Sequence, residues 1–311
     1  MSHSKQNQPN AQTILLLGST GFIGSRVTEK LTLLGYPLRL PNHDEINFDD
    51  PAASSLAQVF QGVDIVINMV GVMSQDAAQL EKIHHYSPVQ LAKAAKAAGV
   101  KSWVNLSALG ASTEQTIAFV ASKGRGDAAL LALSDRDFSV AIARPSLVFG
   151  AGGASCELFI KLARLPVLLL PNAGKDMIQP VHVDDVAQGL INLALFRHNS
   201  VKTEPQTQAQ SPSVPSSAIV NFTGSKVGTL ADYLTMMRTE IHQLRALKII
   251  PITDQLAKIG ARLAQAYTGG LVTPDSLTLL AAGSVADYST FAQVLGYEPL
   301  GYSDFVNKSF T

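Results

Sequence analysis

Three glycines spaced three residues apart are the first group in the chain that could do chemistry. Gly18, Gly21 and Gly24 lie in the stretch GSTGFIG, between the apolar run TILLLG and a segment with helical periodicity. In that context glycines let the backbone approach a pyrophosphate, whose charge meets free N–H groups and the helix dipole. The alternative is a tight turn with close strand–helix packing. We expect a bound dinucleotide in contact with Gly18, Thr20, Gly21, Phe22, Ile23, Gly24 and Arg26.

A second group of functional side chains lies in the middle of the chain. Ser107 follows the apolar run WVNL, and Lys123 lies in AFVASKGRGD, within a predicted helix over 116–134. Phe119 precedes Lys123 by four residues, so the two side chains share a helix face. A lysine ammonium donates hydrogen bonds, whereas a phenyl ring can neither donate nor accept a proton. The simpler interpretations are an exposed lysine and a serine bonded to nearby backbone.

These groups depend on a regular alternation of strands and helices over the first 150 residues. Short apolar runs at 13–18, 63–71, 101–108 and 138–150 indicate buried strands, and segments with helical periodicity lie between them. The order predicts an α/β fold of the Rossmann type, with a doubly wound parallel sheet covered on both faces. Ligands bind beyond the carboxyl ends of such strands. The residues expected there are Asn68, Val70, Gly71, Pro145 and Val148.

The chain is expected to divide near residue 150. The Rossmann core covers 13–150, and 151–311 completes the sheet and adds a small C-terminal α/β lobe for a substrate or partner. The polar segment 1–12 is expected to be a disordered leader. The segment 198–218, rich in Pro, Gln, Ser and Thr, is expected to be a flexible surface loop.

One helix of the second part is strongly amphipathic. In 253–267, Leu256, Ile259 and Leu263 fall on one side, and Lys258 and Arg262 lie elsewhere. We expect this helix to pack on the core of its own lobe. The alternative is that it docks on a membrane surface or on a partner protein.

The residues after the second strand, YPLRLP, bear on the identity of the dinucleotide. Proteins that bind NAD commonly place an acid there for the ribose hydroxyls. Here the register brings Asn42 or His43 to that point, and Asp44 and Glu45 only follow.

Two arginines favour NADP(H) over NAD(H) as the bound dinucleotide. Arg26 and Arg39 could offer positive charge to a 2′-phosphate. An equally simple interpretation is that both are solvated surface charges. The cofactor expected is therefore NAD(P), with NADP(H) preferred.

Composition excludes several other classes of function. The formal net charge is zero and no block of Lys and Arg stands out, which argues against a nucleic-acid partner. No apolar run approaches the roughly 18 residues that a membrane span needs. Cys156 is the only cysteine, so no internal disulfide can form, and it is expected to be a packed residue. His84 and His85 are adjacent, unlike an i, i+4 metal pair, so no metal site is expected.

Several motifs together resemble the extended and atypical branches of the short-chain dehydrogenase/reductase superfamily. RPSLVFG and QPVHVDDVAQGL are similar to segments of nucleotide-sugar epimerases. A closer resemblance is to the nucleotide-binding accessory subunit of respiratory complex I and its bacterial relatives. It is carried by IHHYSPVQLAKAAKAAGVKSWVNLSALGAS, SKGRGD and the late motif LVTPDSLTLLAAGSV, and it covers nearly the whole chain.

The resemblance implies roles for individual residues. In the superfamily a serine polarises a carbonyl, a tyrosine transfers the proton, and a lysine four residues later holds the nicotinamide ribose. Ser107 and Lys123 match this pattern, and Phe119 departs from it at the tyrosine position. His84 falls near an asparagine of the relatives' proton relay, although a packing role is the simpler interpretation. His182 is expected to be structural.

The same resemblance implies a function. We expect an NAD(P)(H)-binding protein with weak or no turnover and a redox-linked accessory role near quinone or respiratory metabolism. It would be cytoplasmic, peripheral to the inner membrane face, with a protein partner or a quinone-like ligand. The alternatives are an active oxidoreductase or nucleotide-sugar epimerase with an altered proton relay, and a regulator that senses NADP(H).

Overall fold

The computed structural model of this chain describes residues 12–51, 56–202 and 218–310. Residues 1–11 of the expected leader and 203–217 of the expected loop lie outside this part of the chain. Residues 198–202 correct that loop prediction, because they continue a long helix, α7 (Val183–Lys202). His198, four residues before the end of this helix, is fully buried.

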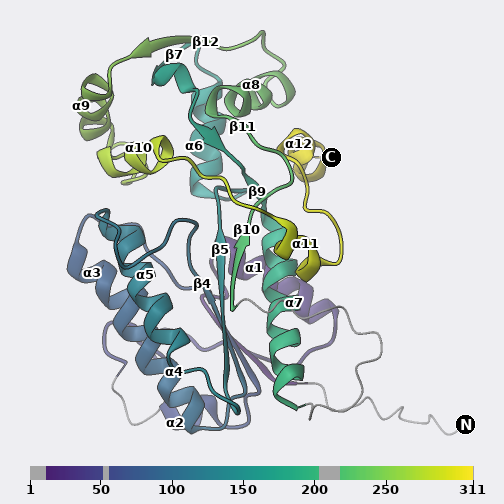
Figure 1. Cartoon of the computed structure of the whole chain (residues 1–311). Helices are drawn as coiled ribbons and strands as arrows, with labels where there is room; N and C mark the ends of the chain where they lie inside the picture. Colours follow the sequence, from purple (N-terminus) through teal and green to yellow (C-terminus); the bar gives the residue numbers. More distant parts are fainter. Residues whose placement is uncertain (1–11, 52–55, 203–217, 311) are drawn as a thin grey trace, which may run out of the picture.

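A parallel sheet of six strands forms the centre of the protein (Figure 1). Buried aliphatic runs form its inner strands, because both faces are covered by helices. The strand order reverses between β1 and β3, and the carboxyl ends near this point form the expected binding edge. In spatial order the strands are β10 (Ile219–Phe222), β5 (Ser139–Pro145), β4 (Ser102–Leu106), β3 (Ile65–Asn68), β1 (Ile14–Leu17) and β2 (Leu38–Arg39).

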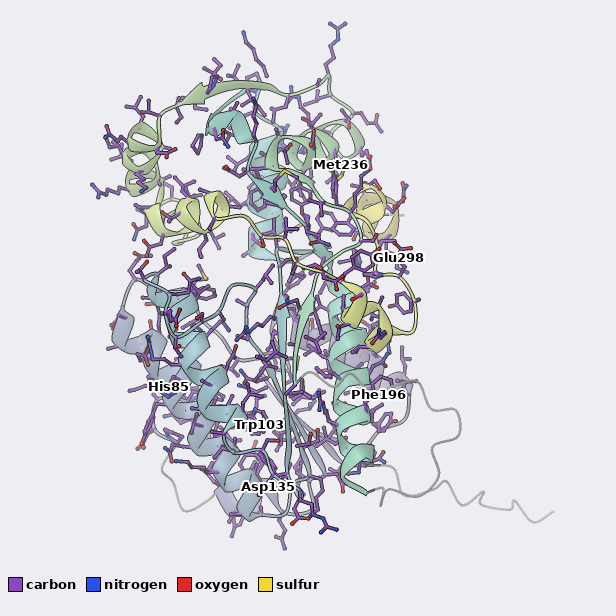
Figure 2. The ribbon with its side chains drawn as sticks, viewed as in Figure 1. His85, Trp103, Asp135, Phe196, Met236 and Glu298 are labelled. Carbon is purple, nitrogen blue, oxygen red and sulfur yellow. The ribbon has the colours of Figure 1, made fainter. Side chains whose placement is uncertain are left out.

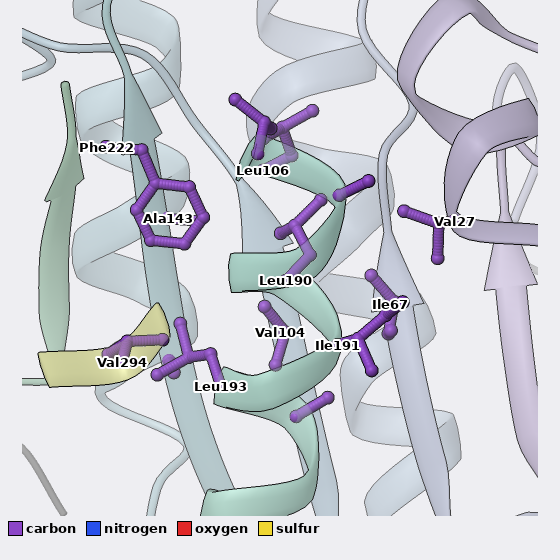
Figure 3. Close-up of a cluster of buried hydrophobic side chains, with 14 of the residues drawn as sticks. Val27, Ile67, Val104, Leu106, Ala143, Leu190, Ile191, Leu193, Phe222 and Val294 are labelled. Atoms are coloured by element: carbon purple, nitrogen blue, oxygen red, sulfur yellow. The ribbon is translucent and has the colours of Figure 1, made fainter. Parts of the chain in front are cut away.

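Helices cover both faces of this sheet, which confirms the doubly wound α/β prediction (Figure 1). On one face, α1 (Phe22–Leu33), α7 and α11 (Ser289–Leu295) pack on side chains such as Ile67 and Val104 (Figure 3). The opposite face carries a second apolar core around the fully buried Trp103 (Figure 2). Its helices are α2 (Leu56–Phe60), α3 (Ala77–Glu81), α4 (Ser87–Ala97) and α5 (Ala118–Leu131).

The helical segment that precedes β4 is not a regular α-helix throughout. A π-helical turn, η1 (Lys82–Tyr86), joins α3 to α4 and carries His84 and His85. Such turns widen the helix locally and are frequent at functional sites. Here the wider turn lies against α5, the helix that carries Lys123.

The C-terminal lobe stands above the carboxyl edge of the sheet in Figure 1. Its own core includes Met236 and is separate from the two cores of the sheet (Figure 2). Short strands pair across it: β6 (Val148–Phe149) with β9 (Val181–His182), β7 (Val167–Pro171) with β12 (Lys248–Ile252), and β8 (Met177–Ile178) with β11 (Gly228–Thr229). Its helices are α6 (Ala154–Ala163), α8 (Leu230–Glu240), α9 (Asp254–Ala264), α10 (Pro274–Ala281) and α12 (Phe305–Phe310), with 3-10 turns η2 (Asn172–Gly174) and η3 (Tyr302–Asp304).

The amphipathic helix does pack on its own lobe, as expected, but its leucine face does not make that contact. Helix α9 turns Ala257 and Ala261 inward, where their small side chains allow a close approach. Leu256, Ile259 and Leu263 point outward and are 57%, 53% and 72% exposed. The periodicity correctly predicts an apolar stripe, but the alanine face makes the contact with the protein.

Candidate functional site

The phosphate loop connects β1 to α1 with very little room between strand and helix. A Cβ atom on Gly24 would lie 1.9 Å from the carbonyl oxygen of Gly18, so only glycine fits there. Gly18 itself has a φ of 77°, in the left-handed region. Helix α1 begins after Gly21 with no side-chain cap and no acid in its first turn. Its first N–H groups are therefore left for an anion, and the loop fits a pyrophosphate.

The other predicted loop residues surround this helix end. Thr20 is exposed at the turn, and Ile23 is half-buried. The Phe22 ring packs against Gly150 and Gly153, since Cβ atoms there would lie within 3.1 Å of its Cζ. The segment that leaves β6 thus lies against the phosphate loop.

The groups predicted to select the dinucleotide lie around the end of β2. Arg39 Nη1 donates a 2.7 Å hydrogen bond to the carbonyl oxygen of Val59, beside the end of α2. Asn42 accepts hydrogen bonds from the backbone of Asp44 and Glu45, and the Glu45 carboxylate accepts one from the Asn42 N–H.

The two remaining candidates at this edge, His43 and Arg26, are more loosely placed. The His43 side chain is exposed. Arg26 lies 3.7 Å from Glu29, one turn along α1, with its side chain 40% exposed. No acid therefore follows β2 directly, although Glu45 closes the turn.

At the end of β3, Asn68 shapes the turn. Its amide nitrogen donates a 2.7 Å hydrogen bond to Asn105 on β4, and its oxygen accepts one from the Val70 N–H. Asn68 is 1% exposed, so its side chain stabilises the turn from the interior of the protein. Gly71 is exposed beyond this turn.

Lys123 and His84 meet beside Gly71. A Cβ atom on Gly71 would lie 3.5 Å from Lys123 Nζ and 3.6 Å from His84 Nε2. Lys123 is 8% exposed and donates to the Leu106 carbonyl oxygen at 3.3 Å. Burial lowers its pKa to about 8, although the negative charge of Asp127 opposes this shift. The structure thus brings the Lys123 ammonium next to Gly71, another of the predicted site residues.

Ser107 is tied to two residues that sequence reasoning missed. Its hydroxyl donates a 2.8 Å hydrogen bond to Asp127 Oδ2, and Arg144 donates to the same oxygen from Nε at 2.9 Å. Arg144 Nη2 is 2.8 Å from that oxygen, which completes an ion pair. Burial raises the pKa of Asp127, although Arg144 and Ser107 both favour its charged form. Ser107 is thereby held by an almost fully buried carboxylate.

A sequence signal for this network did exist. Asp127 lies four residues after Lys123, and therefore on the same face of α5, in SKGRGD. Arg144 directly precedes the predicted site residue Pro145, which is buried at the end of β5. An acidic residue one helical turn from a buried lysine is a reason to search the sequence for a third charged residue that pairs with the acid.

His84 uses both ring nitrogens within the protein. Its Nε2 accepts a 3.1 Å hydrogen bond from the Val72 N–H, so the proton lies on Nδ1 and is donated to Ser122 Oγ at 3.0 Å. Burial, followed by the charge of Lys123, lowers the pKa of His84 to about 3. The imidazole is therefore neutral near pH 7.

Phe119 lies against these two polar residues. Its ring meets His84 edge to face, with centroids 5.4 Å apart, and Lys123 Nζ is 5.6 Å from its centroid. The ring offers a face to the ammonium but no hydroxyl to a substrate. Phe119, Lys123 and His84 thus form one cluster, with Ser107 and Asp127 behind it.

His182 and Cys156 lie in the lobe and not in this cluster. His182 accepts from the Asp184 N–H at 3.2 Å and pairs with Ser309 at 2.8 Å. Cys156 is buried, and burial raises the pKa of its thiol. Across the residues that the structure describes, no group of three or more His, Cys, Asp or Glu is placed to hold a metal ion.

A cavity of about 450 Å³ lies between the core and the lobe. One wall is the loop after β3, a few residues beyond Gly71, and the other is the end of α9 and the turn after it. Arg262 is the only ionisable residue of this lining. The lining residues are Met73, Ser74, Gln75, Arg262, Gln265, Ala266, Gly269 and Gly270.

Comparisons with known proteins find relatives in sequence and in fold. The chain is 24% identical over 313 aligned positions to the NADH-ubiquinone oxidoreductase 40 kDa subunit of Neurospora crassa mitochondria, covering 94% of this chain and 77% of that protein. Among solved structures, gox2253 aligns with a TM-score of 0.68 and 21% identity, covering 96% of this chain and 97% of that one. The NADPH-dependent quinone oxidoreductase QOR2 of Escherichia coli, solved with NADPH, aligns with a TM-score of 0.65 and 17% identity, covering 96% and 100%.

A family model gives the assignment. The model described as the NAD dependent epimerase/dehydratase family matches residues 14–204, from the first strand of the sheet beyond the described part of α7. That range holds the phosphate loop, the cluster around Lys123 and all predicted site residues. This chain therefore belongs to the NAD-dependent epimerase/dehydratase family, with the NAD(P)-binding fold of extended short-chain dehydrogenases and reductases.

Proposed function

We propose that this chain binds an NAD(P)(H) dinucleotide and turns over weakly or not at all, in a redox-linked accessory role near quinone or respiratory metabolism. The carrying observation is Phe119, the ring that lies beside Lys123 and His84 where the superfamily has its proton-transferring tyrosine. General acid–base catalysis typically contributes about 10²–10⁴-fold to a rate. Loss of the hydroxyl removes that contribution.

The position of Ser107 supports the same proposal. Its hydroxyl proton is donated to Asp127, so polarising a substrate carbonyl would require breaking that hydrogen bond. Both ring nitrogens of His84 are also bonded within the protein. Neither Ser107 nor His84 is thus free to replace the missing tyrosine hydroxyl without breaking a hydrogen bond within the protein.

The proposed dinucleotide site runs along the carboxyl edge of the sheet. The pyrophosphate would meet the first N–H groups of α1, and Lys123 would donate to the nicotinamide ribose. A bound nicotinamide supplies or accepts a hydride. Arg39 and Arg26 support a preference for NADP(H), because no acid directly follows β2.

The proposed partners come from the relatives. The 24% identical relative is named as a subunit of an NADH-ubiquinone oxidoreductase, and QOR2 as a quinone oxidoreductase. We infer a protein partner or a quinone-like ligand, and a location at the cytoplasmic side of the inner membrane. Among the described residues no helix has both the length and the apolar character needed to cross a bilayer.

An active oxidoreductase with an altered proton relay is the second candidate, and one observation favours it. Lys123 is buried beside Gly71 with a pKa lowered to about 8, which suits a general acid near neutral pH. In that case the lysine itself would deliver the proton.

The test has two stages. The purified protein is denatured and any released nucleotide is identified by mass, and NADPH and NADH are then titrated into nucleotide-free protein. Binding of either is expected, and failure of both to bind at millimolar concentration refutes the proposal.

NADPH oxidation is then measured with quinones, aldehydes and nucleotide sugars. We expect little turnover from the native protein and a clear gain from Phe119→Tyr. Phe119→Met removes the ring without adding a hydroxyl, and it should give no gain. Robust native turnover that Lys123→Met abolishes would establish the second candidate instead.

A further inference from the structure

Helix α9 carries a stripe of exposed large apolar side chains. Leu256, Ile259 and Leu263 recur at helical spacing, and Tyr267 extends the line beyond the helix end at 93% exposure. Side chains this exposed are ordinary when they are scattered singly. A continuous stripe on one helix marks a surface that meets something else.

The stripe does not serve to attach α9 to its own lobe. That contact is made by Ala257 and Ala261, on a different side of the helix. The segments outside the described residues, 1–11, 52–55 and 203–217, contain no leucine, isoleucine, phenylalanine or tryptophan that could cover it. We therefore take the occupant to be a separate molecule.

Charge indicates what that occupant is. From Leu244 to Thr273 the chain carries four cations, Arg245, Lys248, Lys258 and Arg262, against one acid, Asp254. Asp254 lies in the first turn of α9, where a carboxylate is favoured by the helix dipole. The net positive charge is local, since the whole chain is neutral.

None of these four cations is in an ion pair within the described residues. Helix α10, which packs on α9, carries a further acid, Asp275, in its first turn. Helix α9 therefore combines an outward apolar stripe, a tyrosine at its end and unpaired cations on an adjoining side. This is the pattern of helices that lie in the plane of an anionic bilayer surface.

We infer that the stripe Leu256, Ile259, Leu263 and Tyr267 docks on the surface of a bilayer that contains anionic phospholipid. The inference deepens the peripheral membrane location proposed above by assigning it to one face of one helix. The end of the same helix lines the cavity near Gly71. Docking would bring that cavity close to the lipid surface.

The test is flotation of the full chain with vesicles. Phosphatidylcholine vesicles with added phosphatidylglycerol are expected to carry the protein, and pure phosphatidylcholine vesicles to carry less. The triple variant Leu256→Ser, Ile259→Ser, Leu263→Ser should lose at least tenfold in vesicle affinity, because three apolar side chains no longer leave water. The matched control is Leu33→Ser with Leu34→Ser, two leucines 81% and 59% exposed on and just after α1.

The electrostatic part is tested separately. Lys248→Gln and Lys258→Gln should each weaken binding to the anionic vesicles by about fivefold, and binding to neutral vesicles hardly at all. Circular dichroism confirms that each variant is folded. NADPH titration of the same samples keeps a failure of docking distinct from a failure of nucleotide binding.

Three outcomes would overturn the inference. The native chain would not float with anionic vesicles, or the triple variant would float as well as the native chain. In the third outcome, neither protein floats with the vesicles, and the native chain forms a dimer that the triple variant does not form. That result assigns the stripe to a second copy of the chain.

Discussion

The hydroxyl of Ser107 donates to Asp127 across 2.8 Å, and this bond joins the end of β4 to the middle of α5. The same carboxylate oxygen accepts from Arg144 on β5. One buried acid thus connects the helix that carries Lys123 to two strands of the sheet. Asp127 stabilises the fold through the interactions of its negative charge, because burial alone disfavours a carboxylate.

Asp127→Asn is therefore expected to lower the free energy of unfolding by about 3 kcal/mol, since Arg144 is left without its buried counter-charge. Urea denaturation at neutral pH measures this. Asp135→Asn is the matched control: it breaks an ion pair with Lys96 whose side chains are 35% and 48% exposed, and water screens it. The control should change stability little. Equal effects of the two substitutions would contradict a special role for Asp127.

Lys123→Met should weaken NADPH binding at pH 7 by at least tenfold, because a charged hydrogen bond to the ribose is lost. The native affinity should also fall as the pH rises through about 8, where the Lys123 ammonium loses its proton. The methionine variant should lack this pH dependence. Fluorescence titration across this pH range gives both results.

Lys93→Met, at an exposed position on α4, should bind NADPH like the native chain. Removal of the buried ammonium is not expected to destabilise the fold, since burial of that charge is itself unfavourable. A pH dependence that persists in Lys123→Met would assign the titration to another group.

The parts of the site that sequence could predict are those set by local spacing. The phosphate loop follows from three glycines between a strand and a helix, and the Phe119–Lys123 contact follows from four residues on one helix. The parallel sheet follows from alternating elements. Each depends on residues close together in the chain, where geometry leaves few choices.

The parts that sequence did not predict depend on pairing between distant residues. Asp127 and Arg144 meet only because α5 packs beside β5, and no periodicity records that contact. Helix α9 shows a different limit: the pattern identifies an apolar stripe, but two alanines on another face decide which side packs inward. In α9, close packing through small side chains therefore outweighs burial of the larger apolar side chains.

His84 should make stability depend on pH more steeply in acid. Its pKa is lowered to about 3 in the folded chain, against 6.5 ordinarily, so between these values only the unfolded chain is protonated. Its contribution is therefore lost as pH falls below about 6.5. Between pH 6 and 5 it should cost about 1 kcal/mol of unfolding free energy.

His84→Gln should remove the contribution of His84 to the slope of unfolding free energy against pH, while the contribution of His182 stays unchanged. Urea denaturation at several pH values compares the two slopes, whatever the variant does to stability at pH 7. Parallel slopes for the native chain and His84→Gln would show that His84 titrates normally in the folded state.

Gly126 sets how closely α5 approaches the π-helical turn. A Cβ atom there would lie 2.1 Å from the carbonyl oxygen of His84, a backbone atom that cannot move aside alone. Gly126→Ala should therefore destabilise the protein by about 2 kcal/mol, despite the better helix propensity of alanine. NADPH affinity should fall too, because the shift of α5 moves Lys123 away from Gly71.

Gly260→Ala is the matched control, since this glycine lies within α9 and nothing stands within 4 Å of its added Cβ. At this position the substitution changes only the helix propensity, which is higher for alanine than for glycine. The free energy of unfolding should therefore rise by up to about 1 kcal/mol. The two variants are thus expected to shift the urea midpoint in opposite directions. A stabilising Gly126→Ala would mean that α5 and η1 separate at little cost, and the Lys123–His84 cluster would then not depend on their close packing.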